Sequence, residues 1–434
     1  MLRLTLVSRG YALDPVIAAP VVMALDGGQV THVTVPGGWD QIEYGSGTEG
    51  GEMQTVTTSV SISDPKGELL SLLDAYDPRG SAAAIDQALP GLVAADWEPL
   101  FRGVLDDWSR DGIATKLHLK VDDTALRTPV PASTYERALM TSAAEGTVVG
   151  SPRSLVLGIH DAFTITARGQ VPATCIRYDS TSGYWWEVSV GNMVEVRRVA
   201  INGVVQPSSG WTTRRMVVGA VLATIVVFSA GSQPQKNDVV TVDVEGPDAD
   251  GLADGPAMTN PVRILRSVVE EYVARAAPLA GYRGAHAMID ADSWDAAEAW
   301  FEDHGHDCGI RLGGDQDATG TAAEVIQSFM ESRPYCRIQY TELGTLAFII
   351  MDPDDLDPDA ALGMDLGKMH KVPPFERGDA REVYTHVRQP FLWSAADGKF
   401  ASSYEAHDVA ALPAPGKNQL VLEDRWSQAR YTLE

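Results

Sequence analysis

Short segments in which apolar and polar residues alternate recur along this chain, and they restrict its fold more than any other feature. The clearest run is Val56–Ile62, which ends at the turn residues Asp64-Pro65-Lys66-Gly67. A period of two residues is typical of a strand with one buried face. The pattern therefore predicts a fold built mainly from short strands joined by turns.

The first part of the chain, residues 1–131, contains several such strands. Leu2–Val7 alternates and lacks the continuous apolar core of a signal peptide. Leu100–Leu105 and Ala114–Val121 predict two strands, and Asp111-Gly112 between them is a strong hairpin signal. Glu68–Tyr76 predicts a short helix. We expect these elements to form one β-rich domain.

Residues 132–170 show only a weak pattern, which we interpret as a connecting segment. Residues 171–246 return to alternation, and Asn202-Gly203 predicts a type I′ turn. Val217–Phe228 is the most apolar run, but it is too short to span a bilayer and rich in β-branched residues. Stable membrane insertion is therefore not expected. Strands at this spacing indicate a small sandwich or barrel.

Residues 247–352 begin with a linker and then change to helical periodicity. Asn260 followed by Pro261 predicts a capped helix start, and Thr321 with Glu324 predicts a capping box. Two strands, Cys336–Tyr340 and the segment 345–351, complete an expected α/β unit. Residues 353–434 show strand patterns again, which suits a last small β domain.

The net charge is −25, from 59 acidic and 34 basic residues. Stable binding to DNA depends on neutralising phosphates, so an acidic chain argues against a basic DNA-binding groove. Cys175, Cys308 and Cys336 are far apart and odd in number. This argues against a disulfide framework and favours a reducing compartment.

Two clusters contain residue types that bind metals. His304, His306, Asp307 and Cys308 lie close together, but only Cys336 is available as a distant partner. That spacing does not match a zinc motif, and a polar loop after a helix is the better interpretation.

Asp248, Asp250 and Asp254 resemble part of a calcium loop, but the remaining positions of an EF-hand are out of register. We interpret this stretch as an acidic linker. We therefore assign no metal site and no cofactor.

No nucleotide-binding or hydrolase motif is present, so no residue is assigned a catalytic role. A pair of carboxylates for sugar hydrolysis remains an alternative, because the chain has many acids and sequence does not give their separations. The expectation is a protein without enzymatic activity.

An aromatic cluster is the most specific candidate for a binding surface. It consists of Tyr184, Trp185, Trp186 and Trp211. Adjacent residues of a strand point to opposite faces, so one of the two neighbouring tryptophans should face away from the core of its own domain. Such a residue could contact a partner or stack on a sugar ring, whereas the others could simply fill the core.

The order of these segments and several stretches resemble the tail hub and baseplate hub proteins of tailed bacteriophages. Residues 61–70 followed by Leu100–Leu105 resemble the first barrel of such hubs, in which a strand and a polar turn precede an aromatic-x-Gly strand. Residues 194–203 with Trp211 and 238–246 resemble the inserted β domain of long-tailed-phage proteins. Asn260-Pro261, residues 322–330 and residues 337–351 resemble the α/β portion.

The resemblance implies an α+β, predominantly β, multi-domain fold. Its parts would be two small β-barrel-like domains at 1–131 and 353–434, a β-sandwich inserted at 171–246 and the α/β unit. Hubs of this family are trimers with two barrels per chain, so the six barrels form a ring that matches the hexameric tail tube. Closure of such a ring requires only complementary interfaces and no chemical step. The chain would then be a structural virion protein of the tail tip, assembled in the host cytoplasm.

The expected partners are further copies of the chain in a homotrimer, a distal tail or tail tube protein, and tail-tip or fibre proteins. DNA would pass transiently through the lumen, and acidic residues there would let it slide without sticking. Two alternatives remain: a tail-tip module that recognises cell-surface carbohydrate, and a phage-borne glycosidase.

Overall fold

The structure is a computed structural model, and its secondary structure is mostly strand, which confirms the prediction of a predominantly β, α+β fold with several sheets. The residues that it describes are 2–7, 34–39, 43–44, 56–77, 79–87, 98–138, 149–160, 171–179, 183–191, 193, 195–229, 231–235, 238–248, 255–273, 289–314, 320–333, 335–350, 386–394, 399–407 and 419–421.

The chain forms two compact units, each assembled from separate stretches of sequence. The first comprises Met1–Thr128, Val269–Asp295 and Ile338–Ile349, and the second comprises Pro129–Val268, Ala296–Arg337 and Ile350–Glu434. The division into five segments inferred from sequence stays a prediction.

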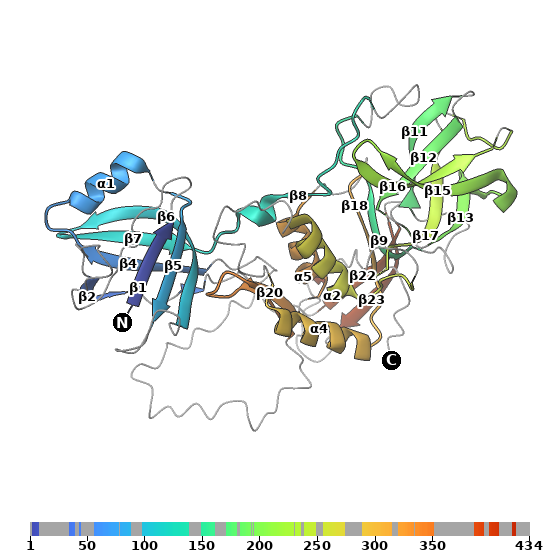
Figure 1. The fold of residues 1–434 in the computed structure, drawn as a ribbon. Helices are drawn as coiled ribbons and strands as arrows, with labels where there is room; N and C mark the ends of the chain where they lie inside the picture. Colours follow the sequence, from blue (N-terminus) through green and yellow to red (C-terminus); the bar gives the residue numbers. More distant parts are fainter. Residues whose placement is uncertain are drawn as a thin grey trace. The chain divides into compact units, whose positions relative to one another are not determined.

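The first unit contains a seven-stranded sheet with the order β1-β5-β6-β7-β4-β2, and β3 also pairs with β4 (Figure 1). Every strand pairing recorded in this sheet is antiparallel. Among the described strands β1 and β2 are the edges, so the sheet is open and does not close into a barrel. The strands are β1 (Leu2–Val7), β2 (Thr34–Trp39), β3 (Glu43–Tyr44), β4 (Val56–Ser63), β5 (Ala82–Gln87), β6 (Glu98–Asp111) and β7 (Ala114–Lys120).

The turn after β4 starts helix α1 (Glu68–Tyr76), as the sequence predicts. Asp64 is buried, and its carboxylate accepts hydrogen bonds from the backbone N–H groups of Leu69 and Leu70. Gly67 adopts a positive φ of 72°, which glycine tolerates best. The carboxylate therefore satisfies N–H groups that the first helical turn leaves without helical partners.

The β6–β7 hairpin contains the longest strand of this sheet, β6, and turns at Asp111-Gly112, as expected. Phe101 is fully buried in β6, and a Cβ atom at Gly103 would lie 2.1 Å from the carbonyl oxygen of Lys120. The aromatic-x-Gly pattern thus has a packing reason: the glycine lets the backbones of β6 and β7 approach closely.

A second hairpin, β20 (Cys336–Tyr340) and β21 (Leu346–Ile350), contributes to the first unit. The backbone N–H of Arg102 donates to the carbonyl oxygen of Glu342 in the turn of this hairpin, at 2.8 Å. Trp294, near the start of helix α4 (Ala291–Asp303), is fully buried and donates its indole N–H to the carbonyl oxygen of Leu346.

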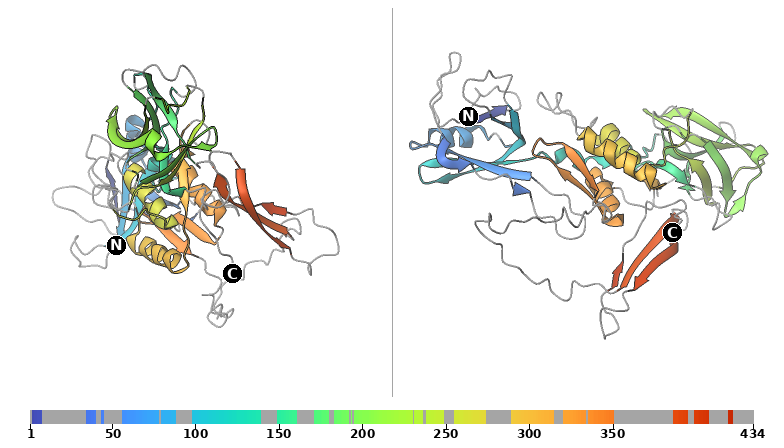
Figure 2. Two further views of the ribbon diagram at one scale, coloured as in Figure 1. Left: turned by 90° about the vertical axis from the view of Figure 1, so that its right-hand side faces the viewer. Right: turned by 90° about the horizontal axis from the view of Figure 1, so that it is seen from below.

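The second unit contains a β-sandwich of two sheets, most of whose strands are coloured green in Figures 1 and 2. One sheet has the order β14-β13-β17-β9-β18, with β10 also on β17; the other has the order β11-β12-β16-β15. The strands are β9 (Leu155–His160), β10 (Val171–Pro172), β11 (Thr174–Asp179), β12 (Gly183–Val190), β13 (Glu195–Ile201), β14 (Val204–Val205), β15 (Trp211–Val218), β16 (Val221–Phe228), β17 (Val240–Glu245) and β18 (Gly309–Leu312).

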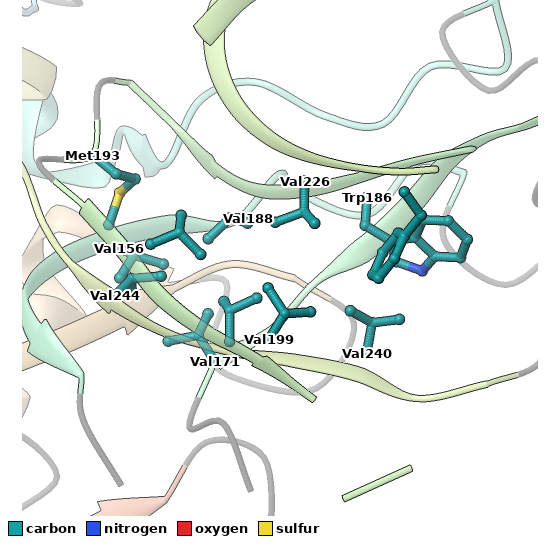
Figure 3. Packing of buried hydrophobic residues seen from close by; sticks show 12 residues of the cluster. Val156, Val171, Trp186, Val188, Met193, Val199, Val226, Val240 and Val244 are labelled. Carbon is teal, nitrogen blue, oxygen red and sulfur yellow. The ribbon is translucent and has the colours of Figure 1, made fainter. Parts of the chain in front are cut away.

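A buried cluster of mainly valine side chains from both sheets forms the sandwich core (Figure 3). Val199 and Val242 come from one sheet, whereas Val188 and Val226 come from the other, so the two inner faces pack on each other. Trp186 closes one end of this core. The prediction of a sandwich or barrel for this region is thereby resolved as a sandwich.

The turns of the sandwich follow the sequence signals. Asn202 and Gly203 both have positive φ, at 50° and 79°, as a type I′ turn requires. The apolar run 217–228 is not one strand, because it turns at Gly219 and joins β15 to β16 in a regular hairpin.

Strand β9 lies inside the segment 132–170, for which the sequence indicates no regular element. It pairs with both β17 and β18 and is buried along most of its length. Burial on both faces removes the alternation that reveals a strand, and Gly158 interrupts the apolar run. A Cβ at this glycine would lie 2.1 Å from the carbonyl oxygen of Cys308, so the close approach of β18 requires glycine.

The helices of the second unit begin where their capping signals predict. The side chain of Asn260 accepts from the N–H groups of residues 262 and 263 at the start of α2 (Pro261–Ser267). Thr321 and Glu324 form a complete capping box at the start of α5 (Ala322–Ser332). Helix α2 continues directly into a π-helix, η4 (Val268–Val273).

A three-stranded sheet, shown in red in Figure 2, is the described part of segment 353–434. β22 (His386–Ser394) pairs antiparallel with β23 (Lys399–His407) and parallel with β24 (Gln419–Val421). The strand pattern expected for this segment is confirmed at these three strands.

Candidate functional site

The aromatic cluster lies on the sheet β11-β12-β16-β15, but its two adjacent tryptophans, Trp185 and Trp186, point to opposite faces. Trp186 faces the sandwich core, is 1% exposed, and packs edge-to-face on Phe228 with ring centroids 5.2 Å apart. An edge-to-face pair in a core contributes on the order of 1 kcal/mol beyond its buried area. Trp186 is therefore a core residue and is too buried to stack on a sugar.

Trp185 lies on the other face of the same sheet, as strand alternation predicts. It is partly buried and packs against a second cluster that includes Ile176 and Ile225. The guanidinium carbon of Arg177 lies 3.8 Å from its ring centroid, which is a cation–π contact. One face of this indole is thus already occupied within the chain.

Tyr184 and Trp211 are also partly buried, and both pack against the sandwich core on the same side as Trp186. Tyr184 makes an edge contact with Tyr178 at 5.0 Å. The four predicted aromatic residues therefore do not form one continuous face. A role in binding stays a prediction for their partly exposed members.

Tyr135 and Arg153 pack on the outer face of this sheet, where a buried ion pair lies that sequence reasoning missed. Arg153 and Glu187 are each 1% exposed or less, and Arg153 Nε lies 2.9 Å from Glu187 Oε1 while Nη2 lies 2.5 Å from Oε2. The remaining Nη1 donates to the carbonyl oxygen of Val218 at 2.9 Å. The partners are far apart in sequence, so no local pattern could reveal them.

Tyr135 packs beside this ion pair and is 1% exposed. Burial raises the pKa of its phenol far above the ordinary range, and the nearby Glu187 carboxylate raises it further. Tyr135 is therefore neutral near neutral pH, and it acts as a packing residue.

The loop after helix α4, which contains the histidines considered as metal ligands, is organised by stacking. His304 stacks on Trp300 with ring centroids 3.9 Å apart, and its Nδ1 lies 2.7 Å from the carbonyl oxygen of Trp300. Cys308 is buried, and its backbone N–H donates to Thr259. Over the described part of the chain, no three His, Cys, Asp or Glu residues are placed to share a metal ion.

Cys336, the proposed distant ligand, is buried, and burial raises the pKa of its thiol to about 12. Only the thiolate binds zinc, so this thiol is poorly suited to the role.

An open pocket of about 510 Å³ lies between this loop and the segment before α2. Three carboxylates, from Asp248, Glu302 and Asp307, line it together with Arg263 and His306. Asp248 is 5% exposed, and its Oδ2 accepts from the N–H of Gly255, so it shapes the loop. Asp250 and Asp254 lie outside the described residues, so the resemblance to a calcium loop is not tested.

Comparisons with known proteins give no assignment. No protein-family model matches the chain, and no curated protein matches it. One solved chain, from a structure described as "Virion of native gene transfer agent (GTA) particle", is similar over 69% of this chain and 72% of its own, at 16% identity and a TM-score of 0.38. At that similarity it does not assign a function. In the described segments no helix is long and apolar enough to span a membrane.

Proposed function

We propose that this chain is a structural protein of a phage-like virion, and specifically a tail hub that connects the tail tube to the tail tip. The observation that carries the proposal is the build of the first unit: strand β4, a polar turn, helix α1, and then the strand β6 with its aromatic-x-Gly pattern. This order of elements is the one in which the sequence resembles the first barrel of hub proteins. A β-sandwich at the position of the inserted domain supports it.

The proposed mechanism is assembly without a chemical step. Three copies form a ring that presents six β domains to a hexameric tube, and DNA passes through the centre. The net charge of −25 suits such a passage, because a wall of like charge does not retain DNA. The lumen is then lined by carboxylates.

Native mass spectrometry of the purified full chain tests the assembly. The expected species is a trimer, at three times 46.6 kDa, which joins tail tube protein into a larger complex when the two are produced together. A strictly monomeric chain that enters no particle contradicts the proposal.

The carbohydrate-binding alternative rests on the partly exposed Trp185. The Arg177 guanidinium over its ring already occupies the position that a sugar would take, which counts against it. Glycan-array binding that is lost in Trp185→Ala, together with a monomeric state, would favour this alternative. No contact among the described residues specifically favours a glycosidase.

A further inference from the structure

Strand β15 (Trp211–Val218) is an edge of the sandwich that is unusually open to pairing. Within the described residues it pairs only with β16, and no strand lies on its other side. Its eight residues include no proline, and its register with β16 runs without a bulge, whereas three other pairings of the sandwich are irregular. A long regular edge leaves a row of backbone N–H and C=O groups that a further strand can pair with.

The side chains of β15 decide which strand can pair with it. Arg214 and Arg215 lie at its centre, and both are exposed. Arg214 makes no ion pair or hydrogen bond with a described residue, whereas Arg215 donates to the carbonyl oxygen of Met193. Val217 is 62% exposed, so the end of the strand offers an apolar contact.

The arginines disfavour pairing of β15 with itself. In a symmetric antiparallel pair of two copies centred on Arg214 or on Arg215, that arginine would lie directly opposite its counterpart in the other copy, and like charges directly opposite each other destabilise a sheet. The two arginines are adjacent, so they point to opposite faces. A matching strand must carry carboxylates at two adjacent positions, one for each face, with an apolar residue next to them.

The chain itself offers no suitable strand in the part that the structure describes. Leu105-Asp106-Asp107 has the required order, but its backbone is already bonded on both sides, to β7 and, at Leu105, to Gly80 and Ser81. Asp106 also forms an ion pair with Lys120, and Asp107 forms one with Arg79.

We propose that β15 is a docking edge for an extended acidic strand of a different protein, which adds to the sheet β11-β12-β16-β15 and places two adjacent carboxylates against Arg214 and Arg215. Backbone hydrogen bonds provide the affinity, and the two ion pairs select the partner.

The distribution of charge along the chain supports an acidic partner. Residues 171–246 carry as many basic as acidic residues, so the net charge of −25 lies on the rest of the chain. An acidic strand is therefore repelled less by this domain than by the rest of the chain.

Binding of synthetic ten-residue peptides to the full chain, measured by fluorescence anisotropy, tests the proposal. The probe alternates Thr and Val around a central Glu-Glu pair; one control has Lys-Lys at the centre, and another is the acidic peptide N-methylated at alternate residues. We expect the acidic probe to bind at least tenfold more tightly than either control, with an affinity that falls as NaCl rises.

Arg214→Glu should weaken binding of the acidic probe about tenfold and strengthen binding of the Lys-Lys peptide. Arg127→Glu, a matched charge reversal at an exposed arginine of the first unit, should leave both unchanged. Equal binding of the acidic and N-methylated peptides would show ion pairing without strand addition and would overturn the proposal. Self-association of the chain that Arg214→Glu abolishes would make a second copy the occupant and would overturn it as well. The test does not depend on the virion role.

Discussion

The buried Arg153–Glu187 pair makes the stability of the sandwich sensitive to a single substitution. In Glu187→Leu, the Arg153 guanidinium keeps its bond to the carbonyl oxygen of Val218 but loses two hydrogen bonds and its counter-charge at a position that is 1% exposed. Leaving one partner of a buried ion pair uncompensated costs about 3–5 kcal/mol. The sandwich is therefore expected to lose much of its stability.

Comparison of Glu187→Leu with a double variant separates this cost from the loss of packing. Replacing both partners by apolar residues of similar size, in Arg153→Met with Glu187→Leu, removes the charge that would be stranded. Such replacements are often neutral or stabilising, so the double variant should be more stable than Glu187→Leu by about 2 kcal/mol or more. Arg127→Met, which breaks an exposed pair with Asp123, should cost no more than about 1 kcal/mol.

Hydrogen exchange followed by mass spectrometry measures these effects in the full chain. Peptides that cover β12 and β16 report the opening free energy of the sandwich, while peptides from β6 and β7 serve as an internal reference. If Glu187→Leu alone protected β12 and β16 as well as the original chain does, the pair would make no contribution and the reasoning would be refuted.

Three further outcomes are expected from the local structure. Gly103→Ala places a methyl group against the Lys120 carbonyl, so it should destabilise the β6–β7 hairpin by about 1–3 kcal/mol, seen as faster exchange confined to that hairpin. Asn260→Ala removes the cap of α2 and should cost about 1 kcal/mol, whereas Asn260→Asp should retain most of it in thermal unfolding. Cys175 should react with iodoacetamide at pH 8 well before Cys336, because burial raises the pKa of the latter thiol to about 12 and keeps it protonated; equal rates by peptide mapping would contradict this.

Local signals predicted much of the fold correctly, because they act between residues that are close in sequence. The Asp111-Gly112 and Asn202-Gly203 turns and the Asn260 cap all depend on the chemistry of a few neighbouring residues. Alternation also predicted correctly that the two tryptophans point apart. It could not predict which one is buried, because that depends on which face of the sheet meets the second sheet.

The features that sequence reasoning missed depend on contacts between distant segments. Strand β9 has no alternation because both of its faces are covered. The ion pair of Arg153 joins two residues whose neighbours give no sign of it. The edge position of β15 follows from the order of strands in the sheet, which a single sequence does not give.

The path of the chain through the sandwich has a consequence for biosynthesis. Two of its strands, β9 and β18, lie on either side of the main run of strands in the sequence, and β9 holds β18 to β17. As the polypeptide emerges from the ribosome, this sheet stays incomplete until Leu312 has been made. Until then, the edge of β9 that pairs with β18 has unpaired backbone N–H and C=O groups. A nascent chain that stalls before Leu312 is therefore expected to be bound by chaperones.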